Sequence, residues 1–339
     1  MPIDSRDPER RDDIIVLIPI FNDWEALATL LEALDASLAG NPARIRVLVV
    51  DDASTCQPSV TPEALRNIAE VLRLPLRRNL GHQRAIAIGL AYIEQSLPCD
   101  AVVVMDGDGE DAPADVPRLM QASRADQGVH VIFAERMRRA EGRLFRALYL
   151  MFRAIHRVLT GRGVRVGNFS IVPRTALHRL VVVSELWNHY AAAVFRSRIP
   201  YLTVPTQRSP RLAGQSHMSF VSLVTHGLSA MSVHGDIIGV RLLVANALCW
   251  GAMGFTLLSV LTIRFFSVLA IPGWASSISM LLIVLMSQSA VLTLVFVFVT
   301  LQGRAGHGFL PIRDYVHYVD PIEPWLTRPR PNATSMTGA

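Results

Sequence analysis

The sequence predicts an α/β fold built on a mostly parallel, doubly wound sheet, followed by helices that span a membrane. Short apolar runs rich in valine, isoleucine and leucine alternate with segments of helical periodicity through the first third of the chain. Two of these runs end in aspartates, and two uncharged stretches longer than about 20 residues lie near the C-terminus. Strands and helices that alternate in this way are typical of a parallel sheet with helices on both faces.

The first strand and helix are predicted by IIVLIPI at 14–20 and by WEALATLLEALDASLA at 24–39, where the helical spacing ends at Gly40. The alternation continues with a strand RVLVVDD (46–52), a helix from Pro62 to Leu72, a strand LPLRRN (74–79), a helix from His82 to Gln95 and a strand AVVVMDGD (101–108). Ligands of such sheets bind beyond the carboxyl ends of the strands. The aspartates that we expect to share one crevice there are Asp51, Asp52, Asp106 and Asp108.

The stretch VVVMDGDGED at 102–111 concentrates acidic side chains that would repel one another without a cation. An EF-hand is excluded, because Asp111 and Pro117 stand where that loop requires glycine and glutamate. Asp111 is assigned to capping the helix that follows. Asp106 and Asp108 lie two residues apart at a strand end and can face one ligand. Their oxygens suit Mg²⁺ or Mn²⁺ bound to a nucleotide diphosphate.

Two stretches of the C-terminal third are long and apolar enough to cross a bilayer. One lies between Arg241 and Arg264, and the other runs from Ala275 to Leu301. A buried hairpin in a soluble core is the alternative, but hydrophobic residues make up 51% of the chain and the excess collects here. The net charge of +5 is concentrated before the first stretch and in the tail, so the positive-inside rule predicts that both termini are cytoplasmic.

The N-terminus and the cysteines indicate the compartment. The opening MPIDSRDPERRDD carries many charges and lacks an apolar core, so it does not match a secretory signal. Cys56, Cys99 and Cys249 have neither metal-ligand spacing nor a disulfide pattern. This cysteine usage suits a reducing compartment.

The chain resembles the family 2 glycosyltransferases of the GT-A fold through four ordered stretches ahead of the two predicted spans: IPIFND (18–23), VVDDAST (49–55), RRNLGHQRAIAIGL (77–90) and VVVMDGDGED (102–111). The nearest subgroup is the polyprenyl-phosphate glycosyltransferases, which include dolichyl-phosphate mannose synthase and bacterial bactoprenol glucosyltransferases. The resemblance covers residues 14 to 303. It implies a nucleotide sugar donor, carrying UDP or GDP, and a polyprenyl phosphate acceptor.

The resemblance also implies roles for the residues around the crevice. Asp52 matches the acid that hydrogen-bonds the nucleotide base, with Pro19 and Asp23 beside it. Asp106 and Asp108 match the metal and diphosphate site, and Asp108 is counted among the catalytic residues. The other matches to the donor site come from the RNxGH stretch and are Asn79, Gly81 and His82.

Basic residues farther along match the part of the family's site that meets phosphate. Arg136 stands where the family has a phosphate-contacting arginine, and Arg211 and Ser216 match its RxxGxSK stretch. Arg136 and Arg211 are counted as catalytic, since they would stabilise charge on phosphate. Arginines interleaved with apolar residues at 142–163 predict a helix in the membrane interface, so membrane lipid is the expected partner rather than nucleic acid.

Two residues depart from the family's pattern. His217 replaces the usual lysine with a side chain that titrates near neutrality. Asn168 stands where relatives carry an acid proposed as catalytic, and asparagine cannot act as a base. The acceptor phosphate has a second pKa of about 6, so it is already a nucleophilic dianion at pH 7 and needs no general base. Both residues are therefore kept in the expected substrate site.

We expect an inverting transferase that moves a sugar from a nucleotide sugar to an undecaprenyl-type polyprenyl phosphate on the cytoplasmic face of the inner membrane. A catalytically impaired scaffold is an alternative because of Asn168 and His217. A processive polysaccharide synthase is disfavoured because no QxxRW stretch follows the catalytic domain. Assembly into a homo-oligomer is left open. The expected organisation is a disordered N-terminus (1–13), a catalytic domain (14–215), an amphipathic juxtamembrane helix (216–240), two spanning helices (241–303, about 242–263 and 275–301) and a cytoplasmic tail (304–339).

Overall fold

The structure is a computed structural model. It describes residues 12–58, 65–136, 154, 157–158, 166–206, 229, 232–266, 273–305 and 308–327. The chain divides into two compact units. The α/β unit contains the described parts of 1–142, 165–233 and 309–339, and the helical unit contains those of 143–164 and 234–308.

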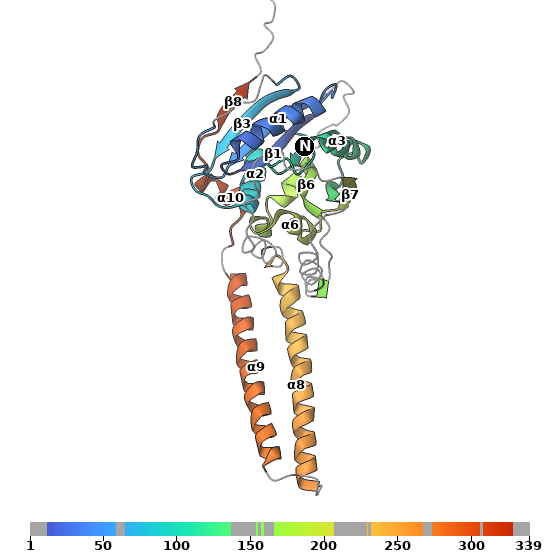
Figure 1. The fold of residues 1–339 in the computed structure, drawn as a ribbon, viewed down its shortest axis with the longest axis vertical. Coiled ribbons are helices and arrows are strands. Elements are labelled where there is room, and N and C mark those ends of the chain that lie inside the picture. The colour runs from blue at the N-terminus through green and yellow to red at the C-terminus, as the bar shows by residue number, and fades with distance from the viewer. Residues whose placement is uncertain are drawn as a thin grey trace, which may run out of the picture. The chain divides into compact units, whose positions relative to one another are not determined.

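The described strands of the α/β unit form one eight-stranded sheet in the order β7-β5-β6-β4-β1-β2-β3-β8 (Figure 1). Strand β1 pairs in parallel with β2 and β4, and β2 with β3 and β5 with β7 do the same. Strand β6 is antiparallel to β4 and β5, and β8 is antiparallel to β3. The predicted α/β fold with a mostly parallel sheet is confirmed. The strands are β1 (Asp13–Ile20), β2 (Arg44–Asp51), β3 (Ile68–Pro75), β4 (Ala101–Val104), β5 (Val131–Arg136), β6 (Val166–Pro173), β7 (Tyr201–Thr206) and β8 (Glu323–Thr327).

Helices cover both faces of this sheet, so its central strands are apolar on both sides. Ile15 and Leu17 of β1 are buried in a cluster with helices α2, α5 and α6, whereas Val16 and Ile18 are buried with α1 and α3. This explains why these strands read as continuous apolar runs instead of alternating ones. The helices are α1 (Trp24–Ser37), α2 (His82–Ser96), α3 (Val116–Ala125), α5 (Arg174–Leu180) and α6 (Tyr190–Arg196), with short 3-10 helices η1 (Pro113–Asp115) and η2 (Ser184–Trp187).

Helix α2 lies unusually close to the sheet at Gly89. A Cβ atom built there would lie 2.4 Å from Leu17 Cδ1 and 2.8 Å from Val50 Cγ2, closer than real Cβ contacts come. The absence of a side chain at this position therefore sets how deeply α2 packs over β1 and β2. The same helix begins at His82.

The predicted helix from Pro62 to Leu72 is wrong over its second half. Residues 59–64 lie outside the described part, but strand β3 already begins at Ile68 and runs parallel to β2. The segment IAEVLRLP contains several good helix formers, and its local preference is overridden by pairing with β2 and by burial of Val71 and Leu74.

The C-terminal segment returns to the sheet. Helix α10 (Pro311–Asp314) and the 3-10 helix η3 (Tyr315–His317) lead to β8, which pairs with β3. The tail that the sequence predicts for 304–339 therefore contains an ordered part of the α/β unit.

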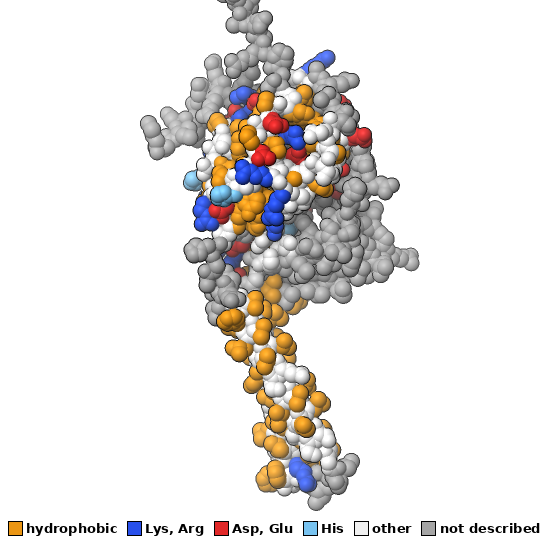
Figure 2. All heavy atoms as spheres, turned by 90° about the vertical axis from the view of Figure 1, so that its left-hand side faces the viewer, with side chains coloured by type: hydrophobic (Ala, Val, Ile, Leu, Met, Phe, Trp, Pro, Cys, Tyr) orange, Lys and Arg blue, Asp and Glu red, His pale blue; other side chains and the backbone are white. Residues whose placement is uncertain are grey.

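The helical unit contains α8 (Gly235–Phe266) and α9 (Trp274–Ala305), and both are long and apolar enough to cross a membrane over Gly235–Phe266 and Trp274–Val299. The predicted two-helix hairpin is thus present in the fold, and α8 also includes the end of the helix predicted for 216–240. Figure 2 shows apolar side chains along this pair. Asn246 Nδ2 donates to Thr293 Oγ1 at 2.7 Å, which links the two helices through a polar contact.

Candidate functional site

The acidic residues gather at one edge of the sheet. Strand β1 lies between β4 and β2, and all three run parallel. Asp51 and Asp52 stand at the carboxyl end of β2, and Asp106 follows the end of β4. Pro19, near the end of β1, pairs in register with Val50 of β2. The topology therefore brings the two acidic stretches to the same edge, where open α/β sheets bind ligands.

Asp52 closes the loop that leads into α2. Its side chain is buried, and its Oδ1 and Oδ2 accept hydrogen bonds from the backbone N–H groups of Leu80 at 2.7 Å and Gly81 at 2.8 Å. Asn79 Nδ2 donates to the Asp52 carbonyl oxygen at 3.2 Å. Gly81 has a φ of +91°, which a side chain would strain. Burial raises the pKa of Asp52, and the two N–H donors only partly offset that effect.

His82 joins this loop to the second acidic stretch. Its Nε2 lies 3.1 Å from Asp106 Oδ1 and 3.0 Å from Asn168 Nδ2. Burial by itself lowers the pKa of His82, but the carboxylates of Asp106, Asp111 and Asp108 together raise it above its ordinary value. Asp52 and Asp106 are thus connected through two neighbouring residues, because Asp52 binds the Gly81 N–H and His82 contacts Asp106.

Asn168 is held by Gln83, which the sequence analysis did not single out. Gln83 Nε2 donates to Asn168 Oδ1 at 3.1 Å, and its Oε1 accepts a hydrogen bond from the backbone N–H of Tyr190 at 2.7 Å. The Tyr190 ring is buried, and its hydroxyl lies 2.7 Å from Ser170 Oγ on β6. The signal for Gln83 was its place directly after His82 in the RNLGHQ stretch. Asn168 of β6 is therefore linked to the acidic edge by His82, which contacts both Asn168 and Asp106.

The second acidic stretch is tightly turned. Asp108 Oδ1 accepts a hydrogen bond from the Glu110 backbone N–H at 3.0 Å. A Cβ atom at Gly107 would lie 3.0 Å from Ile20 Cγ2 and 3.2 Å from the Pro19 carbonyl oxygen, so the residue between the two aspartates must be small. The turn therefore sits directly against the end of β1.

The prediction that Asp111 caps the following helix is wrong. The residues before η1 and α3 are Ala112 and Asp115, and neither helix has a side-chain cap bond. Asp111 is buried instead, and its Oδ2 accepts a hydrogen bond from the backbone N–H of Asp106 at 2.9 Å. The carboxylate supports the turn from inside, because it accepts this backbone N–H.

Asp51 has a cationic partner that the sequence did not indicate. Its carboxylate accepts hydrogen bonds from Arg73 Nη2 at 2.6 Å and Nε at 3.1 Å, and from the backbone N–H of Ser54 at 2.9 Å. Arg73 also lies 5.3 Å from the centre of the Trp24 ring. Asp23 stands at the start of α1 without a side-chain cap bond.

The residues expected to meet the acceptor phosphate are mostly outside the described part. Arg211, Ser216 and His217 lie there, as does most of the predicted interfacial helix at 142–163. Arg136 ends β5, which is separated from β4 by β6. The structure thus brings together predicted donor-site residues, and of the residues expected to meet the acceptor phosphate it describes only Arg136.

The acidic edge offers oxygen ligands for a divalent cation. Among the described residues, no three histidine, cysteine, aspartate or glutamate side chains are grouped to hold a metal ion by themselves. Asp106 Oδ1 is a buried oxygen. Asp108 follows it after a tight turn at Gly107, which packs against Ile20. Two carboxylates at a strand end fit a cation that completes its shell with phosphate oxygens and water.

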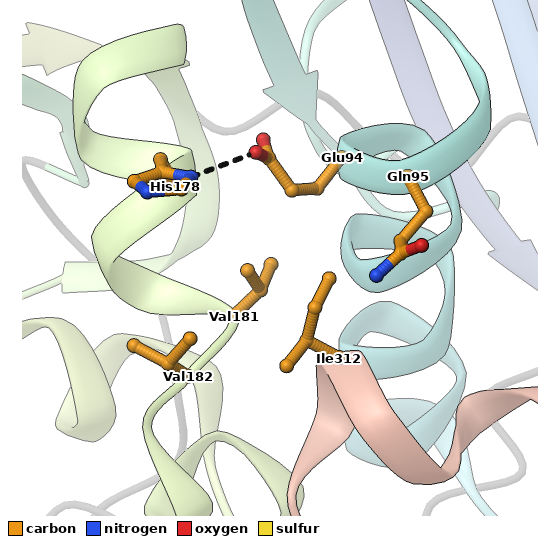
Figure 3. Close-up of a pocket in the computed structure, with 6 residues that line it drawn as sticks. All are labelled: Glu94, Gln95, His178, Val181, Val182 and Ile312. Carbon is orange, nitrogen blue, oxygen red and sulfur yellow. Dashed lines mark hydrogen bonds and ion pairs between the residues drawn. The ribbon is translucent and has the colours of Figure 1, made fainter.

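A separate cavity of about 280 Å³ lies near the other end of α2 (Figure 3). His178 Nδ1 lies 3.0 Å from Glu94 Oε1 at its rim, and Val181, Val182 and Ile312 form its apolar wall. Glu94 is separated from His82 by about three turns of helix. None of the predicted site residues lines this cavity.

Comparisons with known proteins identify the family of the α/β unit. Residues 15–181 match the family described as glycosyl transferase family 2. The undecaprenyl-phosphate 4-deoxy-4-formamido-L-arabinose transferases of Klebsiella pneumoniae and Proteus mirabilis are each 26% identical to the chain. The first alignment covers 66% of this chain and 72% of the relative, and the second covers 75% and 84%.

A solved structure of glucosyl-3-phosphoglycerate synthase from Mycobacterium tuberculosis, in complex with Mn²⁺, UDP-glucose and phosphoglyceric acid, has a TM-score of 0.46 at 15% identity, over 67% of this chain and 80% of that one. The family match carries the assignment, since it spans the strands and loops that hold Asp52, His82, Asp106 and Asp108. Residues 15–181 are therefore a glycosyl transferase family 2 domain, and the chain is a glycosyltransferase.

Proposed function

We propose that this protein transfers a sugar from a nucleotide sugar to a polyprenyl phosphate. The observation that carries the proposal is the arrangement of Asp52, the 79–81 loop, His82 and Asp106 at the carboxyl edge of a family 2 domain. The candidate spans α8 and α9 follow that domain in the same chain and suit a lipid acceptor. Two relatives are named as undecaprenyl-phosphate transferases, which supports an acceptor of that class.

The donor would lie along the acidic edge. In the proposal, Asp52, with Pro19 and Asp23 nearby, forms the side that receives the nucleotide base, and Asn79, Gly81 and His82 line the diphosphate side. Asp106 and Asp108 would hold Mg²⁺ or Mn²⁺. When bound, such a cation offsets the negative charge that develops on the leaving diphosphate. The turn at Gly107 and the Asp111 carboxylate keep these two aspartates in place.

The acceptor phosphate attacks the sugar from the opposite side in this proposal, which inverts the anomeric centre. The phosphate monoester is mostly a dianion at pH 7 and needs no base. Asn168 therefore has a supporting task, because its Nδ2 lies 3.0 Å from His82 Nε2 and its Oδ1 accepts a hydrogen bond from Gln83 Nε2. Arg136, Arg211, Ser216 and His217 are proposed to bind the acceptor phosphate, where cationic donors favour the dianion.

The proposed location is the inner membrane, with α8 and α9 as spans and the α/β unit with both termini in the cytoplasm. The support is the positive charge that flanks the predicted spans on one side, with Arg241 before the first and the basic tail after the second. In this proposal the donor site lies on the face where nucleotide sugars are available.

The function is tested with full-length protein in membranes, undecaprenyl phosphate and a panel of radiolabelled UDP- and GDP-sugars, followed by extraction of lipid. We expect label in the lipid fraction with a subset of donors and only when the acceptor is added. Label that appears in lipid equally without undecaprenyl phosphate, or with none of the donors, would contradict the proposal. The anomeric configuration of the product, measured by NMR, tests inversion separately.

A further inference from the structure

Residues 309–327 are here named the C-terminal clasp. Part of the clasp lies alongside β3 and the start of the loop that leads from β3 into the donor site. Strand β8 pairs with β3, and the pairing continues beyond it through a bridge between Leu76 and Val319. The Asp320 N–H donates to the Pro75 carbonyl oxygen, and the Arg77 N–H donates to the Tyr318 carbonyl oxygen, each at 2.9 Å. Backbone pairing thus reaches to within two residues of Asn79, where the donor loop begins.

Aromatic side chains of the clasp add contacts beyond the loop. Phe309 stacks on Trp187 with ring centres 3.6 Å apart, and Tyr318 lies 5.5 Å from the Trp187 ring. Two arginines that flank the loop lie over the same cluster. The Arg78 guanidinium is 5.9 Å from the centre of the Tyr318 ring, and that of Arg84 is 5.1 Å from the Trp187 ring. The clasp is therefore in contact, directly or through Trp187, with both sides of the 79–83 segment.

The ion pairs of the clasp contribute less than these contacts. Arg77 and Asp320 are 3.1 Å apart but both about half exposed, and such pairs are worth little in water. Glu323 lies 3.4 Å from Arg73, whose shorter contact is with Asp51 at 2.6 Å. Backbone pairing and aromatic packing thus account for most of the attachment.

We propose that the C-terminal clasp is a positioning element of the donor site. By holding residues 75–78 and 84, it keeps the Leu80 and Gly81 amides on the Asp52 carboxylate and His82 beside Asp106. The clasp begins four residues after α9 ends. This inference rests on the proposed function, because it assumes that the 79–83 segment lines the nucleotide site.

The test compares Tyr318→Ala with Tyr318→Phe in the full-length protein. The alanine variant removes the ring under Arg78 and beside Trp187, whereas phenylalanine keeps it. We expect Tyr318→Ala to raise donor KM and the Kd of UDP or GDP about tenfold, with kcat and acceptor KM little changed. Tyr318→Phe should restore wild-type values. Amide exchange should accelerate over 77–83 in the alanine variant only, while β1 and β2 keep their protection.

A matched control is Tyr201→Ala, which removes a partly exposed aromatic ring from β7 at the opposite edge of the sheet. It should leave the Kd of the nucleotide and the exchange of 77–83 unchanged. Unchanged nucleotide affinity and exchange in Tyr318→Ala, or a loss confined to kcat, would overturn the positioning role while leaving the proposed function intact. Wild-type protein that binds neither UDP nor GDP would overturn the proposed donor site, and the role of the clasp with it.

Discussion

Asp52 is the residue on which the donor loop depends most directly, because both of its carboxylate oxygens accept backbone N–H groups. In Asp52→Asn one oxygen becomes an NH₂ group that cannot accept, so Leu80 or Gly81 loses its partner. We expect the free energy of unfolding to fall by about 1–3 kcal/mol, donor KM to rise, and the Leu80 and Gly81 amides to exchange faster. Urea unfolding and hydrogen exchange measure these effects.

Asp23→Asn is the control for the stability and exchange effects, since Asp23 makes no side-chain cap bond that the amide could break. Equal stability and equal exchange in wild type and Asp52→Asn would show that the loop is held by other contacts.

The pair of His82 and Asp106 predicts a pH dependence. The pKa of His82 is raised by three neighbouring carboxylates, so its folded-state value lies above the unfolded value of about 6.5. A group of this kind stabilises the fold fully below the unfolded pKa, and the stabilisation is lost as the pH rises through the folded pKa. Without divalent cations, the free energy of unfolding should therefore fall more steeply above about pH 6.5 in wild type than in His82→Gln. Identical slopes for the two proteins would contradict the assignment.

Helix α2 links the core of the sheet to the site, and Gly89 sets its depth. In Gly89→Ala the new methyl group meets Leu17 Cδ1 and Val50 Cγ2, so the helix or the strands must shift. We expect a loss of about 1–3 kcal/mol in the stability of the α/β unit and weaker donor binding, because His82 begins the same helix. Thermal unfolding followed by circular dichroism measures the first effect. Gly254→Ala, at a helical glycine with open space around it, should cause neither.

At the scale of elements, the sequence predicts what is local and leaves out what depends on distant partners. Strands β1, β2 and β4 are predictable because they are continuous apolar runs, and acids follow β2 and β4. Strand β3 is not, since Ala69, Glu70 and Leu72 favour a helix until β2 pairs with them. Strand β8 is short, contains Pro324, and finds its partner β3 about 250 residues earlier, so no local pattern marks it.

The same distinction holds within the site. Asp106 and Asp108 are predictable because they directly follow a strand, and the loop of Asn79 and Gly81 because it resembles the family's stretch. Gln83 and Arg73 acquire their roles only from Tyr190 and Asp51, which folding brings beside them. Asp111 has the sequence context of a helix cap, yet its carboxylate accepts the backbone N–H of Asp106 instead.

At the scale of the whole molecule, the proposed topology predicts how the cysteines react with a membrane-impermeant maleimide. Cys56 is exposed in the α/β unit, whereas Cys249 lies within α8, where lipid would shield it. Burial raises the pKa of Cys99 to about 11, so little of its thiolate is present at pH 7.5. Labelling should therefore occur in inside-out vesicles only and should disappear in Cys56→Ser. Labelling of Cys56 in sealed right-side-out vesicles would place the α/β unit on the other face.

The central claim is that this family 2 enzyme uses Asp106 and Asp108 to transfer a sugar to a polyprenyl phosphate. The most direct measurement is the initial rate of label transfer to undecaprenyl phosphate, with the donor found in the panel, by wild type and Asp108→Asn reconstituted side by side with Mn²⁺ or Mg²⁺. The asparagine keeps the shape of the side chain but removes a charge that the leaving diphosphate and its cation require. We predict at least a hundredfold loss of rate with unchanged folding and membrane association, and a similar loss in wild type treated with EDTA. Transfer at the wild-type rate by Asp108→Asn, or by wild type in EDTA, would contradict the account.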